Sequence, residues 1–365
     1  MPLLTETFGR HGELVRLAGR DICRADLRHS DVLLVRSVTR VDRDLLHDSG
    51  VRFVGSATIG IDHLDTAWLE SNSIAWAHAP GCNADAAAQY TLAMMMLACE
   101  RLNMDFNRQR IGIIGRGNVG RRIEHLLTAL DIPVMACDPP LFERGEQNLV
   151  SMDEACSNSI ISLHVPLTST GKYPTIGLLD ASRLDRLGAG TLLVNTSRGA
   201  VIEKYGLLAQ LQASRLHAAL DVWPDEPFIG EDLLEAVTVA TPHVAGYSMQ
   251  GKMAGTEMIY RAFCKVFALA TDYLPDTSGK EVTLCFPPLS PANEVLGSSL
   301  ESSCPIARDD AALRAAPRRH SAAMRVQIDA LRADYPERHE FKSHLIRGLS
   351  GTTAHLAGRL GFKTA

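Results

Sequence analysis

Short apolar runs recur through the middle of this 365-residue chain, and most are separated by stretches with helical spacing. Runs of this kind, bounded by polar turns, are typical of buried parallel strands, and strands that alternate with helices imply right-handed crossovers. The pattern therefore predicts an α/β domain with a doubly wound parallel sheet. Its six expected strands, the full complement of a dinucleotide-binding fold, are 111–114, 134–137, 160–163, 192–195, 218–222 and 237–240.

A glycine-rich segment follows the first run and opens a predicted helix over 118–130. It reads Gly115-Arg116-Gly117-Asn118-Val119-Gly120. The first glycine permits a tight turn, the second lets the backbone approach a pyrophosphate, and the third lets the helix pack on the strand. A plain glycine turn is the alternative, since 28 glycines produce chance matches. The position between a strand and a helix favours a dinucleotide site, with the first helical amides facing the phosphates.

The second run ends at Asp138, where a carboxylate would bind the hydroxyls of the adenosine ribose. Pro139 and Pro140 follow it, so no arginine for a 2′-phosphate comes immediately after Asp138. We therefore predict that the cofactor is NAD rather than NADP.

Three later runs each lead into a reactive side chain: Arg198, Glu226 and His243. The carboxyl ends of parallel strands meet at one edge of a sheet, where ligands bind. A histidine could take the hydroxyl proton of a 2-hydroxy acid as hydride leaves its carbon. Glu226 could fix the imidazole tautomer and raise its pKa, and Arg198 could hold a carboxylate. Each residue alone is as often ordinary surface, but together they predict hydride chemistry.

Composition excludes several classes of function. A net charge of −5 argues against a general nucleic-acid binder, and the longest apolar run, near 91–99, is too short to span a membrane. Eight scattered cysteines without a C-x-x-C pair indicate reduced thiols and a cytoplasmic protein. The thirteen histidines include no H-E-x-x-H, so no metal is expected.

The flanking regions predict further domains. Strands are expected at 32–35, 52–54 and 74–76, and a long apolar helix over 84–101 leads into the nucleotide domain. A helical stretch over 248–269 is expected to return to the first domain. Prolines and serines beyond 274 indicate a linker, followed by helical segments at 325–335 and 353–360.

The chain resembles the D-2-hydroxyacid dehydrogenase family over nearly its whole length. The matching motifs are 115–120, Asn195-Thr196-Ser197-Arg198-Gly199-Ala200, Asp221-Val222-Trp223-Pro224-Asp225-Glu226-Pro227 and Thr241-Pro242-His243-Val244-Ala245-Gly246-Tyr247. Additional pieces at 35–39, 79–84, 137–140, 246–252, 308–311 and 335–338 resemble one branch of the family. That branch implies a phosphorylated four-carbon 2-hydroxy acid as substrate and NAD as cofactor.

The resemblance also implies a role for individual residues. Arg198 and Glu226 correspond to the assisting catalytic residues and His243 to the proton donor. Ser37, Thr58 and Tyr247 correspond to substrate contacts. The cofactor contacts implied are Gly115, Gly117, Asn118, Val119, Gly120, Asp138, Val165, Thr196, Ser197, Asp221 and Gly246. Arg36 and Arg338 are candidates for the substrate phosphate, with a plain surface arginine as the alternative at Arg338.

The implied domain division has three parts. Residues 1–88 and 247–272 form a flavodoxin-like substrate domain, 89–246 the NAD-binding domain, and 273–365 an α+β domain that forms a homodimer. Members of the family begin with an additional strand, so the resemblance implies that the first strand is missing here, through a late start codon or a truncated product. A flavodoxin-like sheet places that strand centrally, and its loss would lower stability.

Three other interpretations stay open. The same chemistry could act on 3-phosphoglycerate, glyoxylate or hydroxypyruvate. An NAD-sensing binding protein would share the fold, although the intact Arg198, Glu226 and His243 favour an enzyme. A truncated, poorly folded product is the third.

Overall fold

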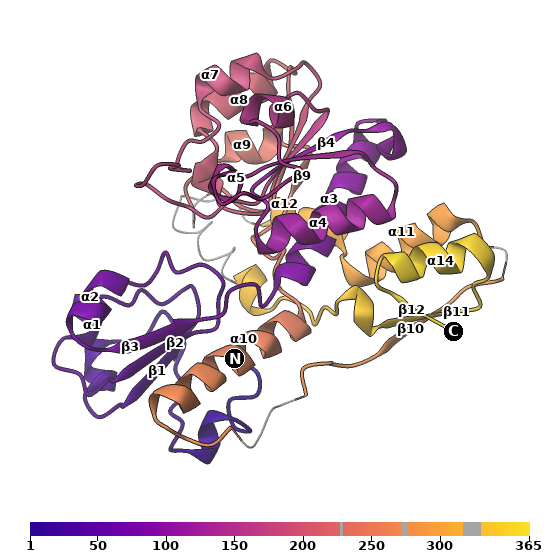
Figure 1. Cartoon of the computed structure of the whole chain (residues 1–365). Helices are drawn as coiled ribbons and strands as arrows, with labels where there is room; N and C mark the ends of the chain where they lie inside the picture. Colours follow the sequence, from indigo (N-terminus) through magenta and orange to yellow (C-terminus); the bar gives the residue numbers. More distant parts are fainter. Residues whose placement is uncertain (227–228, 272–275, 289, 317–329) are drawn as a thin grey trace. The chain divides into compact units, whose positions relative to one another are not determined.

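The computed structural model of the chain describes residues 1–226, 229–271, 276–288, 290–316 and 330–365. Two compact units are present in it (Figure 1). One comprises Met1–Asn83 and Ser248–Gly279, and the other comprises Ala84–Tyr247 and Lys280–Ala365. Each unit has its own sheet and its own hydrophobic core.

The larger unit is built on a six-stranded parallel sheet, which confirms the predicted doubly wound α/β fold. The strand order is β5-β4-β6-β7-β8-β9, so the order reverses between β4 and β6. In open α/β sheets, ligands bind at such a reversal, beyond the carboxyl ends of the strands. The strands are β4 (Ile111–Ile114), β5 (Val134–Cys137), β6 (Ile160–Leu163), β7 (Leu192–Asn195), β8 (His217–Leu220) and β9 (Val239–Ala240).

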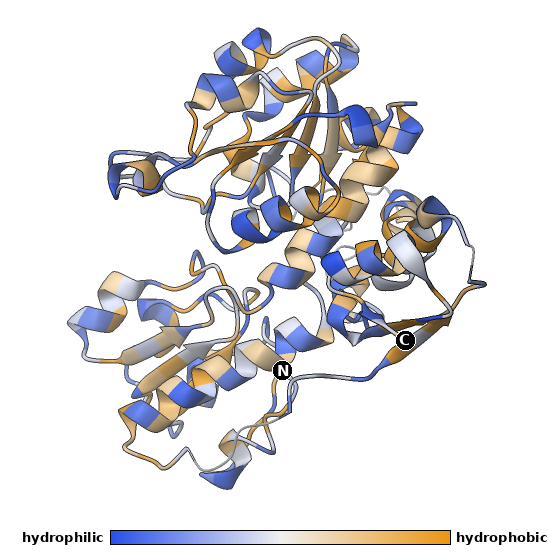
Figure 2. Ribbon diagram, turned by 45° about the vertical axis from the view of Figure 1, so that its right-hand side comes forward, coloured by the Kyte–Doolittle hydropathy of each residue, from blue (hydrophilic) through white to orange (hydrophobic). Residues whose placement is uncertain are grey.

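Helices cover both faces of this sheet (Figure 1). Successive residues of a strand point to opposite faces, so each face carries apolar side chains that pack against helices. Ile113 belongs to the core that includes helices α3 (Ala84–Arg101) and α4 (Asn118–Ala129), whereas Ile114 belongs to the core on the other side. Figure 2 shows the strands as mostly hydrophobic, as expected for strands that are buried on both faces. The second core includes residues of α6 (Met152–Cys156), α7 (Ala181–Arg186), α8 (Lys204–Gln212) and α9 (Glu231–Ala236).

The six strands end in register, and this alignment positions the site. Cα pairing links the last residues of neighbouring strands in one row, Cys137, Ile114, Leu163, Asn195, Leu220 and Ala240. The residues that follow these strand ends therefore share one edge of the sheet. Several predicted site residues, among them Asp138, Gly115 and Asp221, come directly after that row.

The smaller unit contains a three-stranded parallel sheet in the order β1-β2-β3. Its strands are β1 (Val32–Val35), β2 (Phe53–Ser56) and β3 (Ala75–His78), and its helices are α1 (Arg43–Leu46), α2 (Thr66–Ser71) and α10 (Met249–Val266). Helix α10 packs on β2 and β3.

The C-terminal residues of the larger unit form a second sheet in the order β10-β11-β12. All its described strands run parallel, and helical segments join each strand to the next. A parallel sheet with helical connections differs from the α+β arrangement expected for this region. The elements are β10 (Val282–Cys285), α11 (Ala292–Ser303), α12 (Ile306–Ala315), β11 (His344–Arg347), α14 (Gly351–Arg359) and β12 (Lys363–Thr364). Of the helix predicted over 325–335, residues 325–329 lie outside the described residues, as does Pro227 of the third motif.

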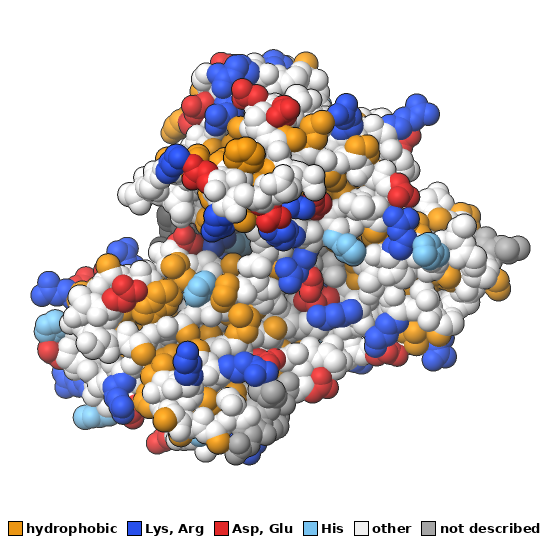
Figure 3. Space-filling model, viewed as in Figure 1, with side chains coloured by type: hydrophobic (Ala, Val, Ile, Leu, Met, Phe, Trp, Pro, Cys, Tyr) orange, Lys and Arg blue, Asp and Glu red, His pale blue; other side chains and the backbone are white. Residues whose placement is uncertain are grey.

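The surface carries charges of both signs. On the face shown in Figure 3, Lys and Arg side chains are interspersed with Asp and Glu side chains. Among the residues that the structure describes, no helix combines the length and apolar character needed to cross a membrane. All eight cysteines are free thiols.

Candidate active site

The glycine loop after β4 packs tightly at two of its glycines and is open at the third. A Cβ on Gly120 would lie 2.0 Å from the Gly115 carbonyl oxygen, and Gly115, with φ of +92°, would place a Cβ 2.6 Å from the His164 carbonyl oxygen. A Cβ on Gly117 would meet nothing within 4 Å. Gly117 is also the N-cap of α4, so the first amides of this helix receive no side-chain cap. These features fit a pyrophosphate-binding loop.

Asp138 is held against this loop from the end of β5. Its carboxylate accepts hydrogen bonds from the backbone N–H of Leu141 (3.0 Å) and of Arg116 (2.9 Å). An arginine therefore does lie beside Asp138, contributed by the glycine loop rather than by the residues after β5. The sequence prediction of NAD rests on the residues that follow Asp138, and Arg116 is not among them. The glycine motif was the signal available for Arg116.

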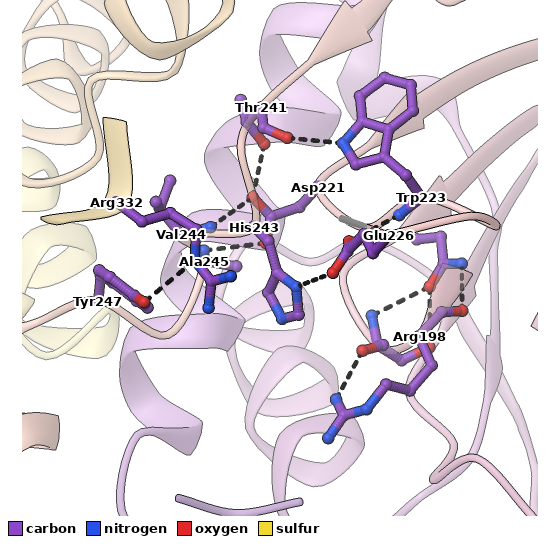
Figure 4. Close-up of polar contacts among 12 residues, drawn as sticks. Arg198, Asp221, Trp223, Glu226, Thr241, His243, Val244, Ala245, Tyr247 and Arg332 are labelled. Atoms are coloured by element: carbon purple, nitrogen blue, oxygen red, sulfur yellow. Dashed lines mark hydrogen bonds and ion pairs between the residues drawn. The ribbon is translucent and has the colours of Figure 1, made fainter. Parts of the chain in front are cut away.

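His243 and Glu226 form a close pair at the same edge of the sheet (Figure 4). The distance between His243 Nδ1 and Glu226 Oε2 is 2.6 Å. The other carboxylate oxygen of Glu226 accepts a hydrogen bond from the Trp223 backbone N–H at 2.8 Å. An ionised carboxylate can only accept, so Nδ1 of His243 carries the hydrogen and Nε2 is the ring atom left for proton exchange with a substrate.

The charge state of Glu226 follows from its surroundings. Burial opposes the charged form, yet the charge and hydrogen bond of His243 and the Trp223 N–H outweigh it and hold the pKa of Glu226 below its ordinary value. Arg332 adds an effect in the same direction. Glu226 is therefore ionised at neutral pH and can stabilise a protonated imidazole.

Hydrogen bonds to the Asp221 carboxylate hold the loop that carries His243. This side chain is fully buried, and its oxygens accept hydrogen bonds from the Thr241 hydroxyl (2.7 Å), the Val244 N–H (2.9 Å) and the Ala245 N–H (3.0 Å). His243 has a φ of +59°, a conformation that non-glycine residues adopt rarely and that needs support from its surroundings. Asp221 supplies that support; its contact with NAD stays a prediction.

Arg198 follows β7, the strand beside β8, and its loop is also held by hydrogen bonds. Asn195 binds both ends of this turn: its amide donates to the Arg198 carbonyl at 2.9 Å and its oxygen accepts from the Ser197 hydroxyl at 2.8 Å. Nη1 of Arg198 donates to the Ser197 carbonyl at 2.8 Å. The Thr196 hydroxyl lies 2.8 Å from that of Thr91 on α3. Arg198 is thus presented at the edge that carries the His243–Glu226 pair (Figure 4).

Two further residues of this edge follow β6. Val165 is partly buried and lies against Gly115. His164 has its Nε2 atom 2.8 Å from the Ser162 hydroxyl, and burial lowers its pKa to about 3, so it is neutral at physiological pH. His164 was not predicted as a site residue, although its place after a strand gave the same signal as the predicted ones.

The predicted substrate contacts fall in both units. Ser37 follows β1 and Thr58 follows β2, at the carboxyl edge of the small sheet, where Val35 and Ser56 are paired. The Thr58 hydroxyl donates to the Gly60 carbonyl at 2.9 Å. In the larger unit, the Tyr247 hydroxyl accepts a hydrogen bond from Arg332 Nε at 3.1 Å (Figure 4).

Arg338 does not fit either interpretation made from sequence. Its side chain is buried, donates to the backbone carbonyls of Ala245 and Tyr247 and to Cys304 Sγ, and lies over the ring of Tyr90. A guanidinium enclosed in this way is neither a surface group nor available to a substrate phosphate. It instead ties the C-terminal residues to the loop that follows His243. The other candidate, Arg36, follows β1 and is half-buried.

The geometry supports acid–base chemistry beside a dinucleotide loop. Residues 87–245 match the protein family described as D-isomer specific 2-hydroxyacid dehydrogenase, NAD binding domain. An erythronate-4-phosphate dehydrogenase of Marinobacter nauticus is 42% identical over 375 residues, covering 100% of this chain and 97% of the relative. The enzyme of the same name from Proteus mirabilis is 37% identical, covering 99% of this chain and 96% of the relative.

Solved structures with the same fold are more distant. A D-lactate dehydrogenase from Aquifex aeolicus, complexed with NAD and lactic acid, superposes with a TM-score of 0.60 at 22% identity, covering 73% of this chain and 91% of that one. A 3-phosphoglycerate dehydrogenase from Entamoeba histolytica with bound NAD⁺ also superposes with a TM-score of 0.60 at 22% identity, covering 69% of this chain and 84% of that one.

Proposed function

Because the chain belongs to the erythronate-4-phosphate dehydrogenase family, within the D-isomer specific 2-hydroxyacid dehydrogenases, we propose that it oxidises 4-phospho-D-erythronate with NAD. The product is 3-hydroxy-2-oxo-4-phosphooxybutanoate. The observation that carries this proposal is the 2.6 Å pair of His243 and Glu226, at the sheet edge that also bears the glycine loop. The protein is thus an NAD-dependent oxidoreductase, and the reaction belongs to vitamin B6 biosynthesis.

Each member of the predicted catalytic set has a defined task in this reaction. The guanidinium of Arg198 binds the substrate carboxylate and polarises the C2 oxygen. Nε2 of His243 takes the proton of the C2 hydroxyl, and Glu226 stabilises the imidazolium that results. NAD, when bound, accepts the hydride from C2. In the reverse direction His243 is the proton donor.

The remaining assignments are parts of the same proposal. Gly117, Asn118 and Val119 bind the cofactor phosphates through the start of α4, and Asp138 binds the ribose hydroxyls. The open space at Gly117 and the orientation of Asp138 toward the loop support these roles. We assign Ser37, Thr58 and Tyr247 to substrate binding. We assign residues 1–88 and 247–272 to a substrate-binding domain, residues 89–246 to an NAD-binding domain, and residues 273–365 to a dimerisation domain.

We further propose a homodimer that forms through the C-terminal sheet. Parallel sheets are ordinarily covered on both faces. Here Ile346 points into the core shared with α11 and α14, whereas Thr283, Cys285 and Arg347 on the opposite face are exposed. A second copy covering that face would complete the burial. The eight free cysteines support a cytoplasmic location, where thiols stay reduced.

The choice of substrate is tested by a panel of acids. Purified protein should give a kcat/KM for 4-phospho-D-erythronate with NAD at least about a hundredfold above those for 3-phosphoglycerate with NAD, or for glyoxylate and hydroxypyruvate with NADH. A site that fits a phosphorylated four-carbon acid would leave polar groups unpaired with an acid that is shorter or lacks the phosphate. A higher value for any competitor would reassign the substrate. NAD binding without turnover of any acid would instead favour an NAD-sensing protein.

A further inference from the structure

Arg116 is the second residue of the glycine loop, and its side chain is held by two carboxylates. Its Nε donates to Glu124 on α4 at 2.6 Å, and its Nη1 donates to Glu146 at 2.9 Å. Arg121 also pairs with Glu146, at 3.1 Å. The Arg116 side chain is only 16% exposed, so these ion pairs are partly shielded from solvent. Such pairs hold a guanidinium in one orientation more firmly than exposed pairs do.

Arg116 also lies beside Asp138, the residue assigned to the adenosine ribose, so its ion pairs bear on the choice between NAD and NADP. The backbone N–H of Arg116 donates to Asp138 at 2.9 Å, so the side chain of Arg116 starts beside the carboxylate assigned to the adenosine ribose. NADP differs from NAD only by a phosphate on the 2′-oxygen of that ribose. An arginine there would normally favour NADP, because guanidinium is the side chain best suited to bind phosphate.

We propose that Glu124 and Glu146 determine cofactor specificity by restraining Arg116, so that the chain contains a latent 2′-phosphate site. With the restraint in place, the guanidinium of Arg116 is engaged by Glu124 and Glu146 and is not available to a 2′-phosphate, while Asp138 presents negative charge to that phosphate. Selection for NAD then depends on this ion-pair cluster as well as on Asp138. The inference rests on the proposed function only in taking NAD as the cofactor.

The test measures binding of NAD and NADP by calorimetry, which requires no turnover. In Glu124→Gln/Glu146→Gln protein, the NADP association constant should rise at least about tenfold, since one charge-assisted hydrogen bond to the phosphate is worth that much. Adding Asp138→Ser should raise it further. Adding Arg116→Ala to either variant should abolish the gain. Thermal melting of every variant establishes that it is folded.

Glu143→Gln is the matched control. Glu143 lies on α5 (Pro139–Glu143), the helix that follows Asp138, and pairs with Lys172 rather than with Arg116. Glu143→Gln removes one carboxylate charge from the same region, as each substitution of the double variant does, and should leave NADP binding unchanged. The proposal is overturned if the double variant gains nothing, if the gain survives Arg116→Ala, or if Glu143→Gln gives an equal gain. Failure of the native protein to bind NAD would contradict the proposed function instead.

Discussion

At the scale of single residues, His243 combines an unusual backbone with a specific partner. Its positive φ turns the imidazole toward Glu226, and the fully buried Asp221 fixes the two amides that follow. Strain of this kind costs roughly 1–3 kcal/mol and persists only where surrounding interactions maintain it. The sequence predicted that Glu226 would meet His243, because both follow strands of one sheet. It could not predict the left-handed turn, which depends on hydrogen bonds from distant residues.

Replacing Glu226 by glutamine should change how stability depends on pH. The pKa of Glu226 is lower in the folded protein than its ordinary value of 4.5, so its charged form stabilises the fold above that pH. This contribution is lost as the pH falls from 4.5 through the folded-state value. The unfolding free energy of the native protein relative to Glu226→Gln should therefore decrease on acidification through this range. Urea titrations of both proteins between neutral and acidic pH measure it, and a pH-independent difference would refute it.

At the scale of elements, the strand ends in register explain why so much of the site could be predicted. Four of the six expected strands, at 111–114, 134–137, 160–163 and 192–195, match the observed bounds. The expected strand at 218–222 ends earlier, at Leu220, because the Asp221 side chain is engaged by the loop after β9. Such an interaction between separate loops leaves no local pattern.

Two glycine substitutions in the larger unit should affect different properties: one should lower the unfolding free energy and the other should weaken NAD binding. Gly199→Ala would place a Cβ 1.9 Å from the Trp223 backbone, so we expect a loss of at least about 3 kcal/mol in unfolding free energy. Gly117→Ala meets open space and should cost less than about 1 kcal/mol. It should nevertheless weaken NAD binding at least about tenfold, because the methyl group would occupy the approach of the pyrophosphate.

Thermal melting and NAD titration of the two glycine variants give both readouts. Gly297→Ala, on α11, is the control, since its Cβ would also meet nothing within 4 Å but lies in a helix far along the chain from the loop. Unimpaired NAD binding by Gly117→Ala would exclude the loop from the cofactor site.

At the scale of the whole molecule, the C-terminal residues share a core with the NAD-binding part. Phe341, Ile346 and Leu360 belong to the same hydrophobic cluster as Ile111 and Leu127. The composition change near 274 indicated a linker, but composition cannot show what the residues beyond a linker pack against. The buried guanidinium of Arg338, which donates to the Ala245 carbonyl, extends this connection to the catalytic loop.

Arg338→Met should therefore be costly although Arg338 is remote in sequence from the catalytic residues. Removal of its buried hydrogen bonds leaves the Ala245 and Tyr247 carbonyls without these donors. Each buried acceptor left unpaired costs about 1–3 kcal/mol, so we expect a loss of about 2–5 kcal/mol in unfolding free energy. Arg359→Met, which removes a surface pair with Asp131, should cost less than about 1 kcal/mol. Denaturant unfolding of both variants decides the matter, and equal costs would show that Arg338 does not tie the C-terminal residues to the loop.

The most direct test of the central claim is NADH formation from 4-phospho-D-erythronate by native protein and by His243→Ala, with NAD affinity measured in parallel. If His243 moves the hydroxyl proton, its removal should lower kcat by about 10²–10⁴-fold while NAD binding stays unchanged. A His243→Ala protein that binds NAD and keeps the native kcat would contradict the account.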